Sequence, residues 1–221
     1  MAEYINTFNL FPVPVFRYAF PDFETKGAPI INHLMSETPW LEDEERNGLQ
    51  ATDANLHKVA ALAPLKDFFQ ECFEDAMDRM GYLKDCGIVS MWGTRHRQGG
   101  HHHGHLHRNC FLAGVIYLYD HDKTAGGTVF HNPNHLLFQI DPPENKDKQR
   151  ILNVSEQMPF IPGTCLIFPG WAAHSTVPCN SNYRLIVAAN MMPIGKTNTD
   201  HYDRYNFPDP ATLDLKQYGD K

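Results

Sequence analysis

The stretch Gly99-Gly100-His101-His102-His103-Gly104-His105-Leu106-His107 leads into the apolar run from Phe111 to Leu118. Five of the thirteen histidines in the chain fall within it. Imidazole is the commonest protein ligand for first-row transition metals, and alternate residues of an extended strand point to the same side. His105 and His107 are therefore placed to bind one metal ion together. A solvated histidine-rich loop is the alternative; a purification tag is disfavoured, because the tract lies in the middle of the chain.

Length and composition indicate an ordinary globular protein. The 221 residues fit one domain and can bury most of the surface that the unfolded chain exposes. Hydrophobic residues make up 42% and charged residues 20% of the chain, which is typical of a folded domain. The net charge of -7 argues against general binding to nucleic acids or to anionic membranes. A local basic patch of Arg95, Arg97 and Arg108 is still available to an anionic substrate.

The cysteines indicate a reducing compartment. The chain has five cysteines, an odd number, and no two of them form a Cys-x-x-Cys pair. Because the sequence also opens without a charged and then apolar signal segment, we expect reduced thiols and a cytoplasmic location. No apolar run approaches the ~20 residues that span a bilayer, so no membrane association is expected.

The helices are expected in the N-terminal part, residues 1–81. Apolar residues recur at helical spacing from Ala28 to Ser36, with Pro29 in the first turn. The strongest helical pattern runs from Pro64 to Met80, where a wide apolar stripe ends at Gly81. We expect this second helix to pack its stripe against a sheet.

Other stretches have weaker patterns. The aromatic opening, residues 4–20, contains two prolines and suits an extended segment or a sheet edge. Residues 37–63 are expected to form a loop with one more short helix, and residues 142–150 a charged surface loop. The polar tail, residues 193–221, is compatible with an arm or a lid.

From residue 82 onward the apolar period becomes strand-like. Short β-rich runs are separated by turn residues such as Gly126-Gly127 and Pro162-Gly163. About eight such runs predict a mainly β fold, a two-sheet jelly roll with the N-terminal helices packed on its outside. We therefore expect a single domain over residues 1–221, with the jelly-roll core at 82–192. The expected strands are Ile88–Thr94, Phe111–Tyr119, Thr128–Phe130, His135–Ile140, Leu152–Phe160, Cys165–Phe168, His174–Val177 and Tyr183–Asn190.

Two distant residues complete the histidine pair. A jelly roll brings early and late strands together at one mouth, so His174 can share a metal with the pair His105 and His107. Ten residues further on, Arg184 begins a strand of small and β-branched residues. A guanidinium at this position can hold a carboxylate through two hydrogen bonds, and burying it unpaired would be costly.

These residues and their order resemble a known family. The chain is similar to the iron(II)- and 2-oxoglutarate-dependent dioxygenases, whose fold is a double-stranded β-helix, within their prolyl-hydroxylase-like branch. It most resembles a group of bacterial and phage oxygenases with a His-x-His motif. The resemblance covers residues 88–190, and the order and spacing of its motifs are specific. The motifs are Trp92, His105-x-His107, Ala113-Gly114-Val115-Ile116-Tyr117-Leu118, Gly126-Gly127-Thr128-Val129-Phe130, Pro162-Gly163-Thr164-Cys165-Leu166-Ile167-Phe168-Pro169, His174, Arg184 and Asn190.

The resemblance implies a function and a role for five residues. His105, His107 and His174 would hold Fe(II). Arg184 would bind the distal carboxylate of the co-substrate 2-oxoglutarate, with Tyr117 as a second donor, although Tyr117 is equally compatible with a core aromatic. The expected enzyme couples oxidative decarboxylation of 2-oxoglutarate by dioxygen to the oxidation of an unknown substrate, most simply its hydroxylation.

The residue at position 107 departs from the wider superfamily, which has His-x-Asp or His-x-Glu. A neutral imidazole leaves the metal with one more positive charge than a carboxylate would. The group that the chain most resembles also tends to have His-x-His. Asp120 and Asp122 follow the next strand and are alternative carboxylates, but a surface turn is favoured for them. His101, His102 and His103 are expected to be solvated or to line the entrance.

Three other classes of protein remain open. A cupin-like enzyme would place a glutamate three to five residues after the second histidine, where residues 110–112 are Cys, Phe and Leu. A three-histidine dioxygenase that uses no oxoacid would leave Arg184 without a role. A non-enzymatic metal-binding jelly roll would bind zinc or nickel and show no dioxygen-dependent turnover.

Overall fold

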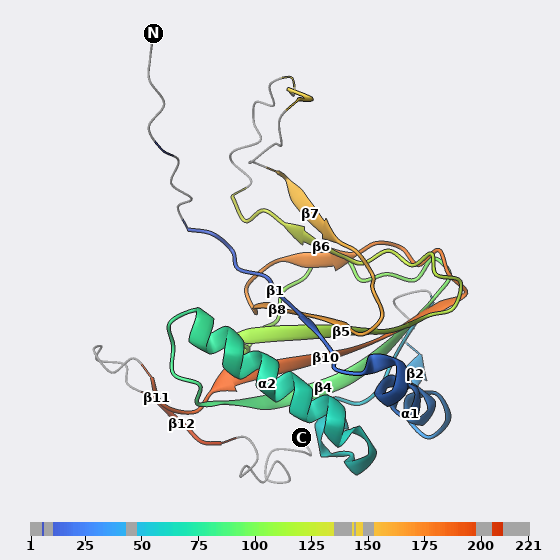
Figure 1. Ribbon diagram of the computed structural model, residues 1–221, viewed down its shortest axis with the longest axis horizontal. Helices are drawn as coiled ribbons and strands as arrows, with labels where there is room; N and C mark the ends of the chain where they lie inside the picture. Colours follow the sequence, from blue (N-terminus) through green and yellow to red (C-terminus); the bar gives the residue numbers. More distant parts are fainter. Residues whose placement is uncertain are drawn as a thin grey trace.

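The structure is a computed structural model that describes residues 6, 11–42, 48–134, 143, 145–147, 153–197 and 205–209. Two antiparallel sheets face each other, and one long helix crosses the outer face of the larger sheet (Figure 1). This arrangement confirms the predicted mainly β jelly roll with helices on its outside. Among the described residues, no helix is long and apolar enough to cross a membrane.

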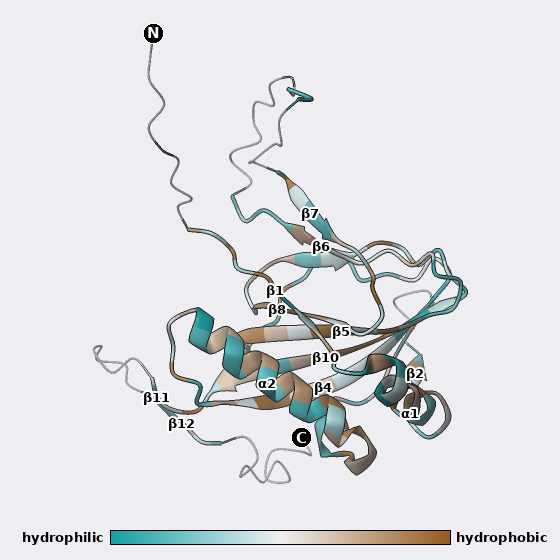
Figure 2. Cartoon of the chain, viewed as in Figure 1, coloured by the Kyte–Doolittle hydropathy of each residue, from teal (hydrophilic) through white to brown (hydrophobic). Residues whose placement is uncertain are grey.

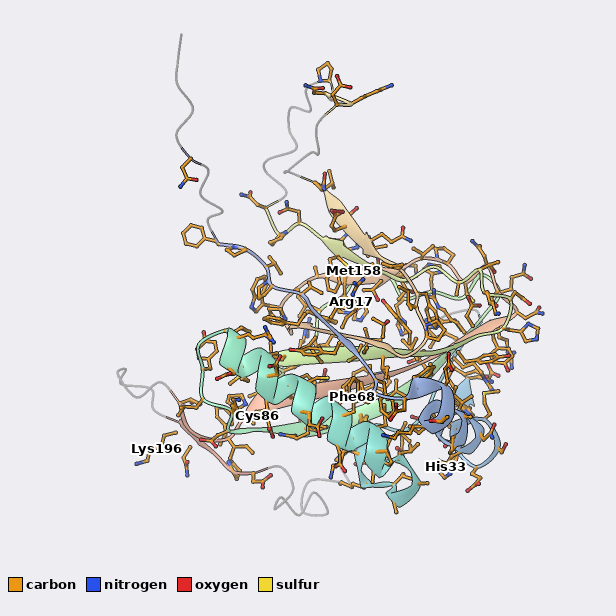
Figure 3. The ribbon with its side chains drawn as sticks, viewed as in Figure 1. Arg17, His33, Phe68, Cys86, Met158 and Lys196 are labelled. Atoms are coloured by element: carbon orange, nitrogen blue, oxygen red, sulfur yellow. The ribbon has the colours of Figure 1, made fainter. Side chains whose placement is uncertain are left out.

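The larger sheet has seven strands in the order β1-β8-β5-β10-β4-β3-β2. The smaller sheet has the order β7-β6-β9, and β11 and β12 form a separate hairpin. Met158 of the smaller sheet and Lys196 of the hairpin lie on opposite sides of the molecule (Figure 3). The strands are β1 (Phe16–Ala19), β2 (Leu41–Glu42), β3 (Leu49–Ala51), β4 (Cys86–Arg97), β5 (Leu112–Asp120), β6 (Thr128–His131), β7 (Ser155–Met158), β8 (Thr164–Pro169), β9 (His174–Thr176), β10 (Tyr183–Pro193), β11 (Gly195–Thr197) and β12 (Tyr205–Phe207).

Side-chain alternation gives the larger sheet two different buried faces. On β10, Leu185 and Val187 belong to the core on the helix side, whereas Ile186 belongs to the core between the two sheets. The neighbouring strand β5 alternates in the same way, with Ile116 on the helix side and Val115 between the sheets. Because both faces are covered, β5 is hydrophobic over most of its length (Figure 2). The space between the two sheets is called the interior below.

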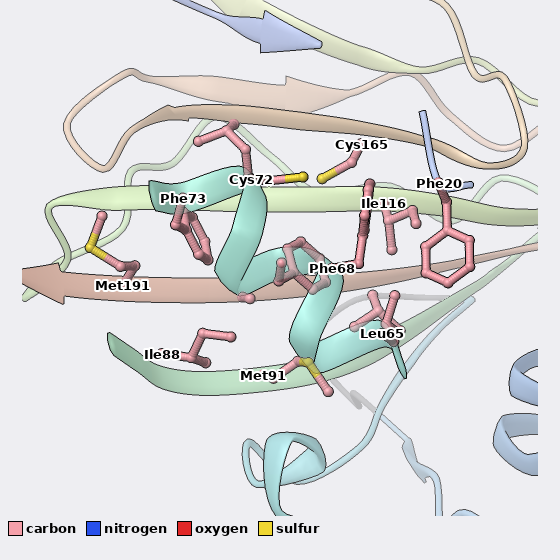
Figure 4. Close-up of a cluster of buried hydrophobic side chains, with 14 of the residues drawn as sticks. Phe20, Leu65, Phe68, Cys72, Phe73, Ile88, Met91, Ile116, Cys165 and Met191 are labelled. Atoms are coloured by element: carbon pink, nitrogen blue, oxygen red, sulfur yellow. The ribbon is translucent and has the colours of Figure 1, made fainter. Parts of the chain in front are cut away.

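The long helix α2 (Ala63–Arg79) covers the outer face of the larger sheet. Its apolar stripe points at the strands, where Phe68 and Phe73 lie among side chains of the sheet (Figure 4). The sheet has room for the stripe because position 114 is a glycine: a Cβ there would lie 2.9 Å from the Phe69 ring. The helix ends before Gly81, whose φ of +83° favours glycine.

Helix α1 (Phe23–Ser36) begins five residues before the predicted start. The carbonyl oxygen of Asp22 accepts hydrogen bonds from the backbone N–H groups of Thr25 and Lys26, which sets the first turn there. Pro29 therefore lies inside the helix, and its predicted place in the first turn is wrong.

The central strands agree with the sequence patterns, and the sheet edges do not. Residues 37–63 were expected to form a loop with one short helix; they instead add β2 and β3 to the edge and form two short 3-10 helices, Leu56–Lys58 and Ala60–Leu62. These edge strands have two and three residues, too few to show a period of two. The expected strand His135–Ile140 lies outside the described residues, and so does most of the loop at 142–150.

Replacing Phe69 by alanine is expected to lower the free energy of unfolding by about 3–5 kcal/mol, because the side chain is fully buried between α2 and the sheet. Urea denaturation measures this loss. Leu83→Ala, at a side chain that is 80% exposed, is the control and should change the free energy by no more than about 0.5 kcal/mol. Equal effects of the two substitutions would contradict the packing described for α2.

Candidate metal centre

The histidine segment, Gly99–His107, runs beside β9 and brings two distant histidines together. The backbone N–H of His105 donates to the carbonyl oxygen of His174, and the N–H of His174 donates back to His105, both at 2.9 Å. A further hydrogen bond of 2.8 Å joins the N–H of His107 to the carbonyl oxygen of Gly170. These backbone hydrogen bonds determine the positions of the three imidazoles.

The imidazoles of His105, His107 and His174 form a compact group. Their potential ligand atoms all lie within 4.8 Å of one another. The ring centroid of His174 is 4.3 Å from that of His105 and 5.2 Å from that of His107. Within the described part of the chain this is the one group of three or more such residues, so neither Asp120 nor Asp122 joins it.

The Nδ1 atom of each imidazole is held by an oxygen outside the group. His105 bonds the carbonyl oxygen of residue 103 at 2.8 Å, and His174 bonds that of Ala172 at 2.9 Å. His107 bonds the side-chain oxygen of Asn190, on β10, at 2.6 Å. Carbonyl oxygens only accept hydrogen bonds, so Nδ1 carries the proton on each ring. In the neutral form of such a ring, Nε2 carries the lone pair that a metal ligand requires.

Burial keeps two of the rings neutral. It lowers the pKa of His174 to about 3, and the neighbouring His105 and His107 lower it further, against a hydrogen bond that raises it. Burial also lowers the pKa of His107, although the hydrogen bond to Asn190 opposes this shift. Both imidazoles are therefore uncharged at neutral pH, which is the form that binds metals.

Arg184 lies on β10, its side chain entering the interior, and is 1% exposed. Its Nη1 donates to the carbonyl oxygen of Gly126. Its Nη2 is buried and has no hydrogen-bond partner. Leaving such a donor unsatisfied costs about 1–3 kcal/mol, more for a charged group. The arrangement fits a guanidinium that is completed by an anionic ligand.

Tyr117 is buried in the interior, but its hydroxyl group already has a partner. The hydroxyl donates to Thr128 Oγ1 at 2.8 Å and accepts from the Thr128 backbone N–H at 3.2 Å. The burial of the ring raises the pKa of Tyr117, and the charge of Arg184 lowers it. Tyr117 thus lies near Arg184, and its hydroxyl proton is donated to Thr128.

A cavity between the sheets adjoins the three imidazoles. Two of its lining residues, Thr94 and Thr176, escaped the sequence patterns, because threonines inside strands are common and these two belong to no motif. The wall includes Thr94, Thr128, Thr176 and His102, together with Trp92 and Ile186. Trp92 was noted in the sequence, and its ring centroid lies 5.7 Å from that of His107.

The expected basic patch does not face this cavity. Arg95 stacks on the Trp40 ring, with its guanidinium carbon 4.8 Å from the ring centroid, and Arg97 pairs with Glu42 at 3.1 Å. Both residues alternate with His96 on β4, so they point to the opposite face of the sheet. Arg95 and Arg97 are therefore not available to an anionic substrate in this cavity, contrary to the expectation from the sequence.

Comparison with known proteins gives a family and several structures of the same fold. Residues 90–190 match the family described as "Putative 2OG-Fe(II) oxygenase". No curated protein matches the sequence.

Three solved structures illustrate the shared fold. The non-heme α-ketoglutarate-dependent epimerase SnoN from nogalamycin biosynthesis is 12% identical, with a TM-score of 0.62 over 91% of this chain and 90% of SnoN. A prolyl-4-hydroxylase from Pseudomonas putida is 13% identical, with a TM-score of 0.57 over 82% of this chain and 93% of its own. HygX from Streptomyces hygroscopicus, solved with nickel, 2-oxoglutarate and hygromycin B, is 11% identical, with a TM-score of 0.55 over 89% and 92%.

At these identities the likeness of structure establishes the fold alone, and the indication of an activity comes from the family match. The matched residues contain the whole set described above: the three imidazoles, the cavity wall, and the buried arginine. Over residues 90–190, a little under half of its length, the chain matches the family of 2OG-Fe(II) oxygenases, and the function that this match indicates is that of an oxygenase dependent on Fe(II) and 2-oxoglutarate.

Proposed function

We propose that His105, His107 and His174 hold Fe(II) through Nε2 and that Arg184 binds the distal carboxylate of 2-oxoglutarate, in an enzyme that hydroxylates its substrate. The observation that carries this proposal is the buried Nη2 of Arg184, which has no hydrogen-bond partner and lies on β10, the strand that also carries Asn190, the acceptor for His107. A dioxygenase that uses no oxoacid gives this donor nothing to bind. Tyr117 is assigned here to hold Thr128 in the cavity wall rather than to contact the oxoacid directly.

The histidines and Arg184 have separate tasks in the proposed reaction. When bound, the metal supplies a place for the oxoacid and dioxygen to react. The three histidines, which line the cavity, would hold that metal, and Arg184, two residues before the cavity residue Ile186 on β10, would fix the carboxylate. Ile186 and Phe168 line the cavity and keep water from the reacting groups.

The third histidine has an electrostatic consequence. Because His107 is neutral where a carboxylate is usual, the three ligands leave the full charge of a divalent metal uncompensated. A dianionic oxoacid is attracted to this centre more strongly than to a carboxylate-ligated one. The co-substrate itself then supplies the negative charge that the protein ligands lack.

We also propose that the enzyme works in the reducing environment of the cytoplasm. The five cysteines are free thiols, and four of them are buried. Thiols of this kind persist where the surroundings are reducing. The partners proposed are 2-oxoglutarate, dioxygen and a substrate that is still to be identified.

Arg184→Ala is expected to raise the dissociation constant for 2-oxoglutarate by about 100-fold or more, because two hydrogen bonds to a charged group are lost. The measurement is an anaerobic titration of the Fe(II)-loaded protein, followed by the weak visible charge-transfer band of a chelated oxoacid. Arg97→Ala is the matched control, since Arg97 pairs with Glu42 on the other face of the sheet.

The two ways in which this titration can fail have different meanings. If wild-type protein binds iron but shows no band, the site is a three-histidine centre that does not take 2-oxoglutarate. If wild type shows the band and Arg184→Ala keeps it at the same concentration, the role given to Arg184 is wrong. Succinate formed in air then tests the reaction type.

His174→Ala should abolish stoichiometric metal binding, whereas His102→Ala should retain it. His174 belongs to the group of three ligand atoms, and His102 lines the cavity without being part of that group. Metal content after anaerobic dialysis and isothermal titration with Fe(II) both report the difference. Equal losses in the two variants would mean that the ligands have been assigned to the wrong histidines.

Asn190→Ala is expected to weaken metal binding by about 10–100-fold, as is usual when the partner that orients a histidine ligand is removed. The amide of Asn190 is the acceptor for Nδ1 of His107. Asn182→Ala, in an exposed position, serves as the control. An unchanged affinity in Asn190→Ala would show that His107 needs no such support or is no ligand.

A further inference from the structure

His96 is a buried histidine outside the proposed ligand set. It lies on β4, is 0% exposed, and is paired across the strands with Arg184 of β10. Asp120 of β5 is paired with Arg184 on the other side. Residues paired across neighbouring strands point to the same face, with Cβ atoms about 4.5–5.5 Å apart. The three side chains therefore form one row beside Ile186, which lines the cavity.

Each member of this row has one buried polar atom without a hydrogen-bond partner: Nδ1 of His96, Nη2 of Arg184 and Oδ1 of Asp120. The other carboxylate oxygen of Asp120 accepts from the Ala125 backbone N–H at 2.8 Å. Among the ion pairs of the described residues, none joins Asp120 to Arg184, although the two are neighbours. Buried polar groups are normally satisfied, so Nη2 of Arg184 and Nδ1 of His96 point to a ligand that accepts hydrogen bonds from them. Oδ1 of Asp120 is itself an acceptor, so such a ligand does not complete it.

The proton of His96 is controlled by its contact with His102. Nε2 of His96 lies 3.0 Å from Nδ1 of His102, so one of these two nitrogens donates to the other. Burial, and then the charge of Arg184, lower the pKa of His96 well below its usual value, which leaves one proton on the ring. If His102 is the donor, that proton sits on Nδ1 of His96. An anion beside Arg184 favours this tautomer, because it accepts from Nδ1–H and is repelled by a bare lone pair.

We propose that His96 is a specificity-determining residue of the oxoacid site, whose Nδ1–H donates to the distal carboxylate of 2-oxoglutarate beside Nη2 of Arg184. This inference rests on the proposed function. The two oxygens of the carboxylate each take one donor, from neighbouring strands of the larger sheet. The two donors, from His96 and Arg184, select 2-oxo acids that have a second carboxylate. His102 is a positioning residue that keeps the proton of His96 on Nδ1.

Two substitutions of His96 distinguish the loss of its hydrogen bond to the carboxylate from the loss of its contact with His102. The asparagine amide takes the place of Nδ1, so His96→Asn keeps a donor toward the carboxylate and loses the contact with His102. The glutamine amide takes the place of Nε2, so His96→Gln keeps the contact with His102 and loses the donor. We expect His96→Gln to weaken 2-oxoglutarate binding by about 10–100-fold, the effect of one hydrogen bond to a charged group. His96→Asn should stay within about threefold of wild type.

The experiment measures the dissociation constants of 2-oxoglutarate and of pyruvate in the anaerobic Fe(II) titration. Pyruvate has the same 2-oxo acid end but no distal carboxylate, so His96→Gln should leave its affinity unchanged. The preference for 2-oxoglutarate over pyruvate should therefore fall by about 10–100-fold in this variant. Iron affinity, measured separately by isothermal titration, and the urea midpoint should remain those of wild type. His101→Gln, whose ring contacts the Gly99 carbonyl oxygen, is the control.

The outcomes distinguish this inference from the proposed function. If wild type gives no band with 2-oxoglutarate, the proposed function fails first. If wild type gives the band and His96→Gln binds 2-oxoglutarate as tightly as wild type, the role of His96 is overturned. It is also overturned if His96→Asn is the weaker binder of the two, because the contact with His102 would then be what matters. A parallel loss of pyruvate affinity would mean that His96 only shapes the cavity.

Discussion

Burial of both faces of β10 is the constraint on which the rest of the structure depends. Its odd-numbered side chains from Leu185 onward pack under α2, so they must be apolar. The even-numbered ones enter the interior, where Arg184 and Asn190 are placed along the same line. A shift of one residue in register would bury the polar set beneath the helix and turn the apolar set toward the cavity. The packing of the helix-side core thus fixes the geometry of the site on the opposite face.

The helices, the long strands and the candidate site residues could be predicted from the sequence, because they depend on periodicity and on motif spacing. The stripe of α2 and the long strands β4, β5 and β10 repeat their patterns over enough residues to be recognised. Three histidines and one arginine were singled out, and the structure brings the histidines together and buries the arginine with one unsatisfied donor. The roles of these residues in binding remain proposals, which the variants above address.

What escaped prediction depends on contacts between distant residues. His96 carries no motif, and its importance follows only from its pairing with Arg184 across two strands that are far apart in the sequence. The basic patch was expected to serve an anionic substrate, but charge alone does not say which face of β4 a residue occupies. Arg95 and Arg97 lie on the face away from the cavity. The short strands β2 and β3 are formed by pairing with the edge of an existing sheet rather than by their own residues.

The acceptors that hold the three imidazoles differ in how far away they lie along the chain. His105 and His174 each bond the carbonyl oxygen two residues before them, so their orientation is a local property of the backbone. His107 is oriented by Asn190, 83 positions away. The ring orientation of two of the proposed ligands can therefore be set locally, whereas the third is oriented only once β10 has joined the sheet. A metal bound at the proposed site would prefer the completed native state and would raise its free energy of unfolding.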